Sequence, residues 1–313
     1  MTMEGTGSTD STGISDSTGI PIDEELLRSL LREQHPDLAD LALDHAARGW
    51  DNELWRLGED LAIRMPRTPR APDLLVKEYR RLPALAPLLP LPVPTPVRLG
   101  RPSPRFPAPW TVVTWVPGDP ADRVPVTRAD HAADALADFL RALHRPAPAD
   151  APANPDRGVP LATHAAGIDR ALRTMDLGEF APDDVRRVWE AGLAAPAWRE
   201  PAVWLHGDLH PANVVTADGT LTGVIDFGEM CAGDPATDLA AAWLLLPDGS
   251  APRFFTSYGT DDQALVRRAR AWAVRSAFGL LSIGQAGEKG LPGGKPTWGT
   301  AGRAALRRIL ADG

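Results

Sequence analysis

Cysteine is almost absent from this sequence, and long apolar runs are missing altogether. The 313 residues contain one cysteine, Cys231, which cannot form an internal disulfide, so nothing in the chain calls for an oxidising compartment. No apolar run approaches the roughly twenty residues that a membrane-crossing helix needs, and no secretory apolar segment precedes the body of the chain. We therefore expect a cytoplasmic globular protein with no membrane partner.

An excess of positive charge is also missing. The 33 Lys and Arg residues are outnumbered by 41 Asp and Glu, which gives a formal net charge of -8. Proteins that bind nucleic acid generally need basic surface to displace counterions from phosphates, so this balance argues against a nucleic-acid partner. An acidic balance would suit a cationic substrate, but it also keeps a protein soluble. Composition therefore leaves the substrate open, and the sequence does not define the oligomeric state.

The length of the chain suits a protein of two lobes better than one small domain. Residues 1–22 repeat the sequence DSTGI and carry almost no large apolar groups, which predicts a disordered tail. Dense prolines, ending in the Val-Pro-Gly sequence at 116–118, favour extended connections over a helix. We place the boundary there, with a first lobe over 23–117 and a second over 118–313.

Hydrophobic spacing predicts helices and strands in the first lobe. Leucines at helical spacing indicate a helix that begins at Asp23, and Pro36 separates it from a second helix through Leu41 and Leu43. The turn at 58–60 indicates a β-hairpin. The further predicted elements are hairpin strands at 54–57 and 61–65, a helix at 72–89, and strands at 96–99 and 110–116.

The second lobe has mainly helical patterns, interrupted by β-rich runs. The predicted helices cover 127–144, 161–174, 183–193, 235–246, 262–284 and 300–311. The predicted strands cover 203–206, 213–216 and 221–225. Glycine is frequent in residues 287–299, so we expect a loop there.

The interruption carries the most informative residues of the chain. His206, Asp208 and Asn213 stand in the order H-x-D-x-x-x-x-N, and Asp226 then opens the sequence D-F-G. This is the order of the catalytic and metal-binding loops of kinases. Either sequence alone is typical of a turn, because Asp and Asn favour turns. Both occur in order, each after a β-rich run, and together they predict phosphoryl transfer.

The chemistry of phosphoryl transfer explains these residue types. The transition state spreads charge over phosphate oxygens, so a kinase needs metal ligands to neutralise that charge and a carboxylate to orient the attacking hydroxyl. Asp208 is the candidate for this carboxylate, which accepts the hydroxyl proton. Asn213 and Asp226 are the candidates for holding Mg²⁺, a hard cation that prefers oxygen ligands.

The sequence around these motifs resembles a known family. HGDLHPANVV, from His206, and GVIDFGEMCAGDPATDLA, from Gly223, are similar to the aminoglycoside phosphotransferase family, whose fold is similar to that of protein kinases. The resemblance implies an α+β, bilobal, protein-kinase-like fold. A smaller N-terminal lobe, with an antiparallel sheet plus helices, would bind nucleotide, and a larger, mainly helical C-terminal lobe would hold the catalytic and substrate sites. It also implies that Asp208 is the catalytic base and that Asn213 and Asp226 bind magnesium.

Residues close to the motifs are predicted to be structural. Because Mg²⁺ disfavours imidazole, we expect His206 to hydrogen-bond the loop backbone rather than bind a metal. Asp238 matches a family position that stabilises the loop. We expect Asp234 to cap a helix, since Pro235 then takes the first helical position.

A kinase must also hold the nucleotide phosphates, for which a cation on a strand pairs with a carboxylate on a helix. Arg64 and Glu78 are the candidates. The family usually has Lys where Arg64 stands, and Arg makes a wider, bidentate contact with phosphate. Together with Pro66 and Arg67, Arg64 forms an R-x-P-R sequence that resembles the macrolide phosphotransferase branch.

The purine base, adenine or guanine, is expected between the lobes, on main-chain groups of Thr114, Trp115 and Val116. Trp115 is a candidate for stacking on the base, with core packing as the alternative. The turn at 49–52 lies where a phosphate-covering loop would lie, but it lacks the G-x-G-x-x-G pattern.

Acceptor sites in the family lie in the helical lobe and are often acidic when the acceptor is an aminoglycoside. Glu229 is the nearest acidic candidate, and His210 is a candidate for contacting phosphate or substrate. Asp261 and Asp262 are read as helix caps. The residues that could form an apolar wall, or the core instead, are Trp243, Trp272, Trp298 and Tyr258.

These residues predict a small-molecule kinase that uses Mg²⁺ and ATP or GTP, with an antibiotic as the first acceptor considered. Alternatives within the enzyme class are a macrolide, a peptide antibiotic, or a metabolite such as a sugar, choline or homoserine. An alternative of another class is a pseudokinase that binds nucleotide without catalysis. The intact set of Asp208, Asn213 and Asp226 argues against it, because a binder has little chemical need for all three.

Overall fold

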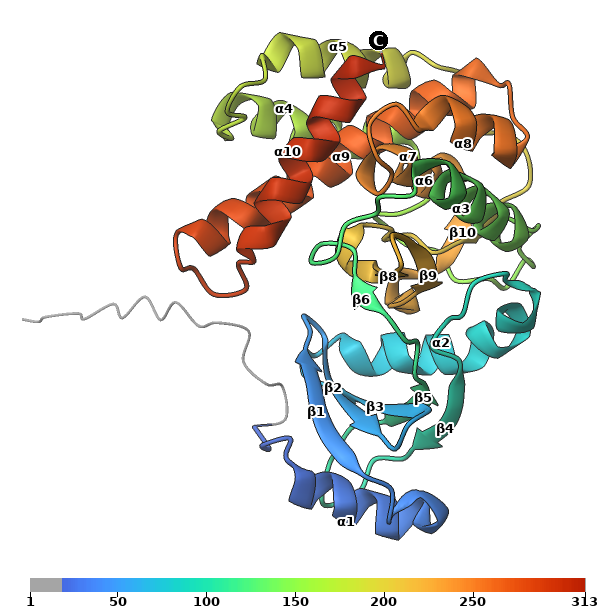
Figure 1. Ribbon diagram of the computed structural model, residues 1–313, viewed down its shortest axis with the longest axis vertical. Helices are drawn as coiled ribbons and strands as arrows, with labels where there is room; N and C mark the ends of the chain where they lie inside the picture. Colours follow the sequence, from blue (N-terminus) through green and yellow to red (C-terminus); the bar gives the residue numbers. More distant parts are fainter. Residues whose placement is uncertain (1–18, 313) are drawn as a thin grey trace, which may run out of the picture.

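The computed structural model describes residues 19–312 and has two lobes, with the N-terminal lobe at the bottom of Figure 1. Residues 1–18 of the predicted tail lie outside the described residues. Ile20 and Ile22, near its end, pack against the core of the N-terminal lobe. Among the described helices, none has the length and apolarity that a membrane crossing requires.

An antiparallel sheet forms the centre of the N-terminal lobe. Its strands are β1 (Leu43–Arg48), β2 (Asn52–Leu57), β3 (Leu61–Pro66), β4 (Pro96–Gly100) and β5 (Trp110–Thr114), in the spatial order β1-β2-β3-β5-β4. Helix α1 (Glu24–Gln34) covers one face, where its leucines meet the sheet in a shared core. Helix α2 (Ala71–Leu85) lies on the other side, between the sheet and the second lobe (Figure 1).

The predicted hairpin of the first lobe is confirmed, and the predicted second helix is wrong. Strands β2 and β3 pair from Asn52 with Pro66 to Leu57 with Leu61. Instead of a helix through Leu41 and Leu43, the chain makes a short 3-10 turn at Pro36–Leu38 and then enters strand β1. Only the first residue of β1 is buried, so the strand depends on its pairing with β2, and local spacing carried no signal of it.

Helices α3 to α10 dominate the C-terminal lobe, as the resemblance implied. They share one large core with the end of α2, so the core runs from one lobe into the other. Two small sheets interrupt them: β7 (Val203–Leu205) pairs with β10 (Cys231–Gly233), and β6 (Asp119–Pro120), β8 (Val214–Ala217) and β9 (Thr220–Val224) form the second. The helices are α3 (Ala129–Leu143), α4 (Ala165–Thr174), α5 (Pro182–Leu193), α6 (Ala236–Leu239), α7 (Ala241–Leu244), α8 (Ala251–Tyr258), α9 (Gln263–Glu288) and α10 (Pro296–Ala311).

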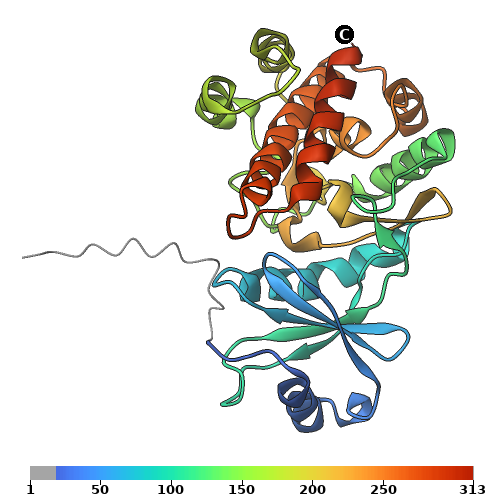
Figure 2. The same ribbon diagram turned by 60° about the vertical axis from the view of Figure 1, so that its left-hand side comes forward.

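The predicted loop over 287–299 is shorter than expected: residues 289–295 connect two helices, and the residues at both ends of the stretch are helical. Helix α9 continues to Glu288 and α10 already begins at Pro296, where proline suits the first turn. The glycines allow the two helices to approach: a Cβ at Gly284 would lie 2.2 Å from Gly299. The turn between α9 and α10 points back toward the N-terminal lobe (Figures 1 and 2).

Two smaller differences also have local causes. The predicted helix over 235–246 is divided at Ala240 into α6 and α7. Helix α8 was not predicted, because proline, glycine and aspartate at 247–249 read as a loop signal with no helix after them.

Candidate functional site

The catalytic-type loop begins directly after strand β7 and is fixed by buried groups. The carboxylate of Asp238, which is fully buried, accepts hydrogen bonds from the main-chain N–H groups of His206 (2.7 Å) and Gly207 (2.8 Å). His206 donates from Nε2 to the carbonyl of Ile225 (3.0 Å) and accepts at Nδ1 from the N–H of Asp208 (3.2 Å). Asp238 and His206 therefore fix the backbone of the loop by hydrogen bonds, as the sequence predicted.

Glycine is required within this loop. Gly207 has a φ of +86°, and a Cβ there would lie 2.7 Å from the carbonyl oxygen of Glu229. The left-handed conformation and the close approach both exclude a side chain. The two motif loops are thus packed backbone to backbone.

The structure brings Asp208, Asn213 and Asp226 together where the two lobes meet. The Asn213 side-chain amide donates to the main-chain carbonyl of Asp208 (2.9 Å) and to its carboxylate (3.4 Å). The N–H of Ile225 donates to the carbonyl of Asn213 (2.9 Å), which ties the two loops together. Asp226 has a φ of +64°, an uncommon conformation for a side-chain-bearing residue, and its carboxylate is 55% exposed.

The carboxylate of Asp208 lies among positively charged groups. One oxygen is 3.0 Å from Nη2 of Arg157, and the other is 3.5 Å from Nε2 of His210. Burial acts to raise the pKa of Asp208, but the hydrogen bond and charge of His210 and the charge of Arg157 outweigh it, so the pKa lies well below its ordinary value. Asp208 is therefore ionised at neutral pH.

The predicted Arg64–Glu78 pair forms, and it reaches the candidate metal residue. Arg64 Nη1 lies 2.5 Å from Glu78 Oε2, and Nη2 lies 3.2 Å from Asp226 Oδ1. Both partners are buried, with 8% and 1% of the side chain exposed. Burial raises the pKa of Glu78, and the charge of Arg64 opposes this effect. The pair joins β3 and α2 to the loop of the second lobe.

A second ionic link between the lobes was not predicted. Arg70 lies between the carboxylates of Asp51 (2.5 Å) and Glu229 (2.6 Å), and Glu229 also accepts from the side chain of Asn154 (2.7 Å). Asp51 belongs to the turn at 49–52, which Arg70 thus links to Glu229 of the second lobe. Glu229, the acidic acceptor candidate, is fully engaged by protein groups.

The candidate base-binding segment at 114–116 follows strand β5 into the second lobe. The main-chain N–H of Thr114 donates to the carbonyl of Thr95 (2.9 Å), and that of Trp115 donates to the carbonyl of Asp60 (2.7 Å). The Trp115 ring lies under the guanidinium of Arg56 at 5.1 Å. Both N–H groups are thus used within the first lobe, and the assignment of main-chain groups of Thr114, Trp115 and Val116 to the base stays a prediction.

The aromatic residues divide as the core-packing alternative predicted. Trp243 and Trp272 are buried, and Tyr258 hydrogen-bonds His144 (2.8 Å) away from the cleft. Trp298, at the start of α10, is different: its ring packs on that of His210, with 4.6 Å between centroids. Helix α10 therefore reaches the catalytic-type loop.

Three polar residues at the site were missed from the sequence: Arg70, Asn154 and Arg157. None lies in a motif, and the last two come from an irregular segment between α3 and α4 whose prolines read only as a connection. The acidic motif residues indicated that basic partners should lie near them. The sequence has 33 Lys and Arg residues, however, and nothing in it shows which of them are the partners.

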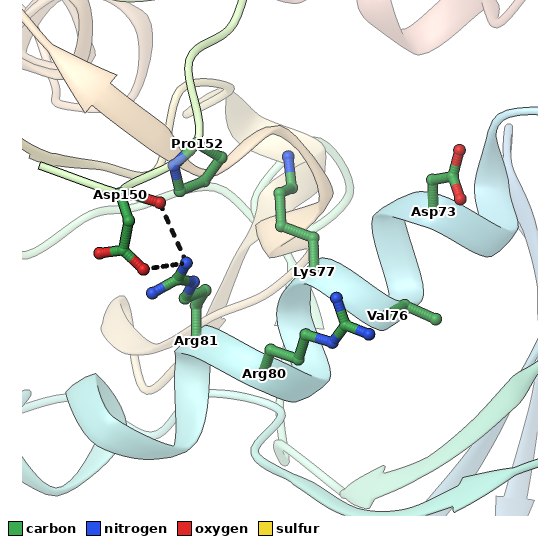
Figure 3. A pocket seen from close by; sticks show the side chains of 7 residues that line it. All are labelled: Asp73, Val76, Lys77, Arg80, Arg81, Asp150 and Pro152. Atoms are coloured by element: carbon green, nitrogen blue, oxygen red, sulfur yellow. Dashed lines mark hydrogen bonds and ion pairs between the residues drawn. The ribbon is translucent and has the colours of Figure 1, made fainter.

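A separate pocket lies between α2 and the segment around Pro152 (Figure 3). Arg81 and Asp150 close one side with an ion pair of 2.8 Å, and burial lowers the pKa of Lys77, which points into it. None of the predicted site residues lines this pocket. Within residues 19–312, no cluster of three or more His, Cys, Asp or Glu side chains is arranged to hold a metal.

A two-lobed fold with these two loops packed together where the lobes meet defines the class of kinase-like phosphotransferases. The family model described as "Phosphotransferase enzyme family" matches residues 44–275, and the chain belongs to that family.

Curated relatives and solved structures agree with this assignment. The chain is 32% identical over 168 residues to an aminoglycoside 3'-phosphotransferase of Escherichia coli, which is 49% of this chain and 59% of the relative. It is 37% identical over 137 residues to a streptomycin 3''-kinase of Streptomyces griseus, which is 40% and 49% of the two chains. The matches thus span about half of this chain and no more than 59% of each relative.

Solved structures share the fold over nearly the full chain. The GDP complex of wild-type aminoglycoside 2'-phosphotransferase-IIIa has a TM-score of 0.66 at 20% identity, covering 93% of this chain and 99% of that one. The macrolide 2'-phosphotransferase MphH from Brachybacterium faecium has a TM-score of 0.56 at 24% identity, covering 91% and 98%. The predicted bilobal, kinase-like fold is confirmed.

Proposed function

We propose that this protein is a kinase that moves the γ-phosphate of ATP or GTP onto a hydroxyl of a small molecule. The observation that carries the proposal is the meeting of Asp208, Asn213 and Asp226 where the lobes join, with the buried Arg64–Glu78 pair beside Asp226. The names of the relatives support antibiotics as the first acceptors to test. A macrolide, a peptide antibiotic or a metabolite is the alternative.

The reaction forms one bond and breaks another. The acceptor oxygen bonds to the γ-phosphorus as the bond to the β–γ bridging oxygen breaks, and the products are a phosphorylated acceptor and a nucleoside diphosphate. The carboxylate of Asp208 accepts the hydroxyl proton. Since its pKa is held low, Asp208 is a weak base, and its main task is to orient the hydroxyl for in-line attack.

The residues present fit Mg²⁺. The Asn213 amide nitrogen donates to Asp208, which leaves the amide oxygen as an acceptor, and the Asp226 carboxylate is half exposed to the cleft. Two oxygen ligands suit an ion that keeps several waters, so the lack of a larger cluster among the described residues agrees with this assignment. When bound, Mg²⁺ would neutralise phosphate charge.

The two lobes would have different roles in the reaction. In this proposal residues 23–117 hold the nucleotide: Arg64, positioned by Glu78, meets its phosphates, and main-chain groups of residues 114–116 meet the base. Residues 118–313 supply the catalytic loop and the acceptor site. The contact between His210 and Trp298 supports a role for both at the acceptor side, because it joins α10 to that loop.

The deciding experiment is phosphate transfer from γ-labelled ATP and GTP to a panel of hydroxylated antibiotics and metabolites. Asp208→Ala is expected to slow transfer by about 10² to 10⁴-fold while Mg-nucleotide affinity stays within about a few-fold, because Asp208 acts on the acceptor. The control is Asp184→Ala, a half-exposed carboxylate that pairs with Arg187 within α5.

Two outcomes would count against the proposal. Equal loss of nucleotide binding in Asp208→Ala would contradict its role at the acceptor. Nucleotide binding without transfer to any acceptor would favour a non-catalytic regulator instead.

A further inference from the structure

The pocket between α2 and the segment around Pro152 is lined by none of the residues assigned to catalysis. Its volume is about 230 Å³. That is the space of several water molecules, at roughly 30 Å³ each, and it is below the roughly 300 Å³ at which pockets for drug-sized ligands begin. The pocket therefore has room for a molecule of a few carbon atoms, and it is too small for a nucleotide or an antibiotic.

One side of α2 supplies most of the lining. Five lining residues are spaced three or four positions apart, so they share one side of the helix: Asp73, Val76, Lys77, Arg80 and Arg81 (Figure 3). Three of them are cations, whose side chains are hydrogen-bond donors only. Asp73 is exposed, and no ion pair joins it to Lys77. This wall therefore presents positive charge and donors.

The opposite wall belongs to the second lobe and is tied in place. Arg81 donates to the main-chain carbonyl of Asp150 (3.0 Å) and to its carboxylate (2.8 Å). The carbonyl of Pro152 accepts from the N–H of Ala232 in β10 (2.9 Å). The charges of Arg81 and Asp150 thus offset each other, and the pocket is held between two elements that are joined directly.

Lys77 is the cation of this pocket that has no anionic partner. Its ammonium group points into the pocket (Figure 3), and the side chains of Lys77 and Arg80 form no ion pair or hydrogen bond within residues 19–312. Lys77 is half-buried, and burial lowers its pKa. Glu229 and Glu78, whose charges favour the ammonium form, are each already paired with an arginine. An anion in the pocket would offset the cost of burying this charge.

We propose that the pocket binds a small anionic molecule, a carboxylate or a phosphate monoester, with Lys77 as its main contact and Arg80 at the rim. Hydrogen bonds from Lys and Arg to these oxyanions are stronger than those between neutral groups. Arg80 is exposed, so it can reach an anion without losing another partner. The inference does not rest on the proposed function, because Asp208, Asn213 and Asp226 do not line the pocket.

Three probes with a three-carbon frame test the inference: glycerol 3-phosphate, glycerate and glycerol. Binding to the full chain is measured by calorimetry at neutral pH, with and without a non-hydrolysable Mg-ATP analogue that would fill the nucleotide site. One or both anionic probes are expected to bind with a Kd of about 1 mM or below, and glycerol is expected not to bind. The anion that binds more tightly distinguishes phosphate from carboxylate.

Variants locate the bound probe. Lys77→Gln is expected to weaken binding about ten-fold or more, because it removes a charged hydrogen bond, and Lys77→Arg should keep part of the affinity. Lys289→Gln, at an exposed lysine that follows α9, is the matched control and should bind as the unmodified protein does. Asp208→Ala should also bind normally, which separates this pocket from the acceptor site. Thermal unfolding checks that each variant is folded.

Chemical labelling tests the same contact without any substitution. The chain has three lysines, Lys77, Lys289 and Lys295, so acetylation by acetic anhydride can be followed at each of them by mass spectrometry. The anionic probe that binds should slow acetylation of Lys77 by about ten-fold at a concentration of ten times its Kd. Acetylation of Lys289 should not change, and glycerol should protect neither residue.

Four results would overturn the inference. They are the failure of both anionic probes to bind, an unchanged affinity in Lys77→Gln, acetylation of Lys77 that no probe slows, and binding that the Mg-ATP analogue abolishes. The last result would place the anion at the nucleotide site instead. None of these results bears on phosphate transfer, which is measured separately with the labelled nucleotide.

Discussion

The Arg64–Glu78 pair allows a quantitative test, because its two partners are buried to different degrees and have different second partners. Arg64→Met leaves Glu78, which is 1% exposed and has one carboxylate oxygen without a hydrogen bond in the described residues. Glu78→Leu leaves Arg64 with Asp226 at 3.2 Å. Removing one partner of a buried ion pair costs about 3–5 kcal/mol. We expect the loss of unfolding free energy to lie near the upper end of this range for Arg64→Met, and near or below the lower end for Glu78→Leu.

The double variant separates stability from function. Replacing both partners with apolar side chains of similar volume is often neutral, so Arg64→Met with Glu78→Leu is expected to recover most of the lost stability. Nucleotide affinity should not recover, since the cation for the phosphates is gone. Urea unfolding gives the free energies, and calorimetry with Mg-nucleotide gives the affinities. Leu85→Ala, a buried position about two turns after Glu78 in the same helix, controls for general loosening of α2.

The stability of Arg64→Met is also expected to depend on pH. Burial raises the pKa of Glu78, and the variant removes the charge that opposes this. A carboxyl whose pKa is higher in the folded than in the unfolded protein contributes stability at low pH that is lost as pH rises through the folded value. Arg64→Met should thus gain stability relative to the unmodified protein on acidification. This reasoning would be refuted if the double variant were as unstable as the less stable single variant. It would also be refuted if the stability of Arg64→Met relative to the unmodified protein did not change with pH.

Three further predictions concern the surroundings of the site. Asp238→Ala leaves two buried N–H groups without an acceptor, and it should lower the free energy of unfolding by about 3 kcal/mol in urea unfolding and slow transfer; Asp248→Ala, on the surface, should do neither. Gly207→Ala should abolish transfer in the labelled-phosphate assay even where the protein folds, because the loop must move from Glu229; unchanged transfer would contradict the required close packing. The pKa of His164 is lowered from 6.5 to about 4, first by burial and then by Arg275, so the unfolded chain binds more protons in that range. Stability should therefore fall from pH 6.5 toward 4 by at most about 3 kcal/mol, and His164→Gln should remove this slope in thermal unfolding.

The sequence predicted best those parts whose chemistry is local. Asp208, Asn213 and Asp226 lie on two short loops, and the spacing of residues within each loop nearly determines which groups can meet. The β2–β3 hairpin was also predicted, because alternation and turn residues lie next to each other in the chain. His206 and Asp238 could be assigned to scaffold roles from metal chemistry and family resemblance before their hydrogen bonds were known.

The predictions were wrong where the local structure depends on contact with another element of the fold. Strand β1 has one buried residue and exists through pairing with β2, so its own pattern did not indicate a strand. Gly299 was assigned to a loop with the rest of 287–299, but it lies in α10 and, with Gly284, allows close packing of α9 on α10. In both cases tertiary contact decided the local structure.

The acceptor side shows why a family assignment does not extend to the substrate. The nucleotide end of the cleft repeats chemistry that every phosphoryl transfer needs, so its residues recur in a recognisable order. Arg157 lies 51 positions before Asp208 in an irregular segment, so no spacing rule connects the two residues. Only the fold brings the Arg157 guanidinium to the Asp208 carboxylate, at 3.0 Å. The residues that surround the acceptor therefore have to be found from the structure of this chain, because the motifs that define the family do not include them.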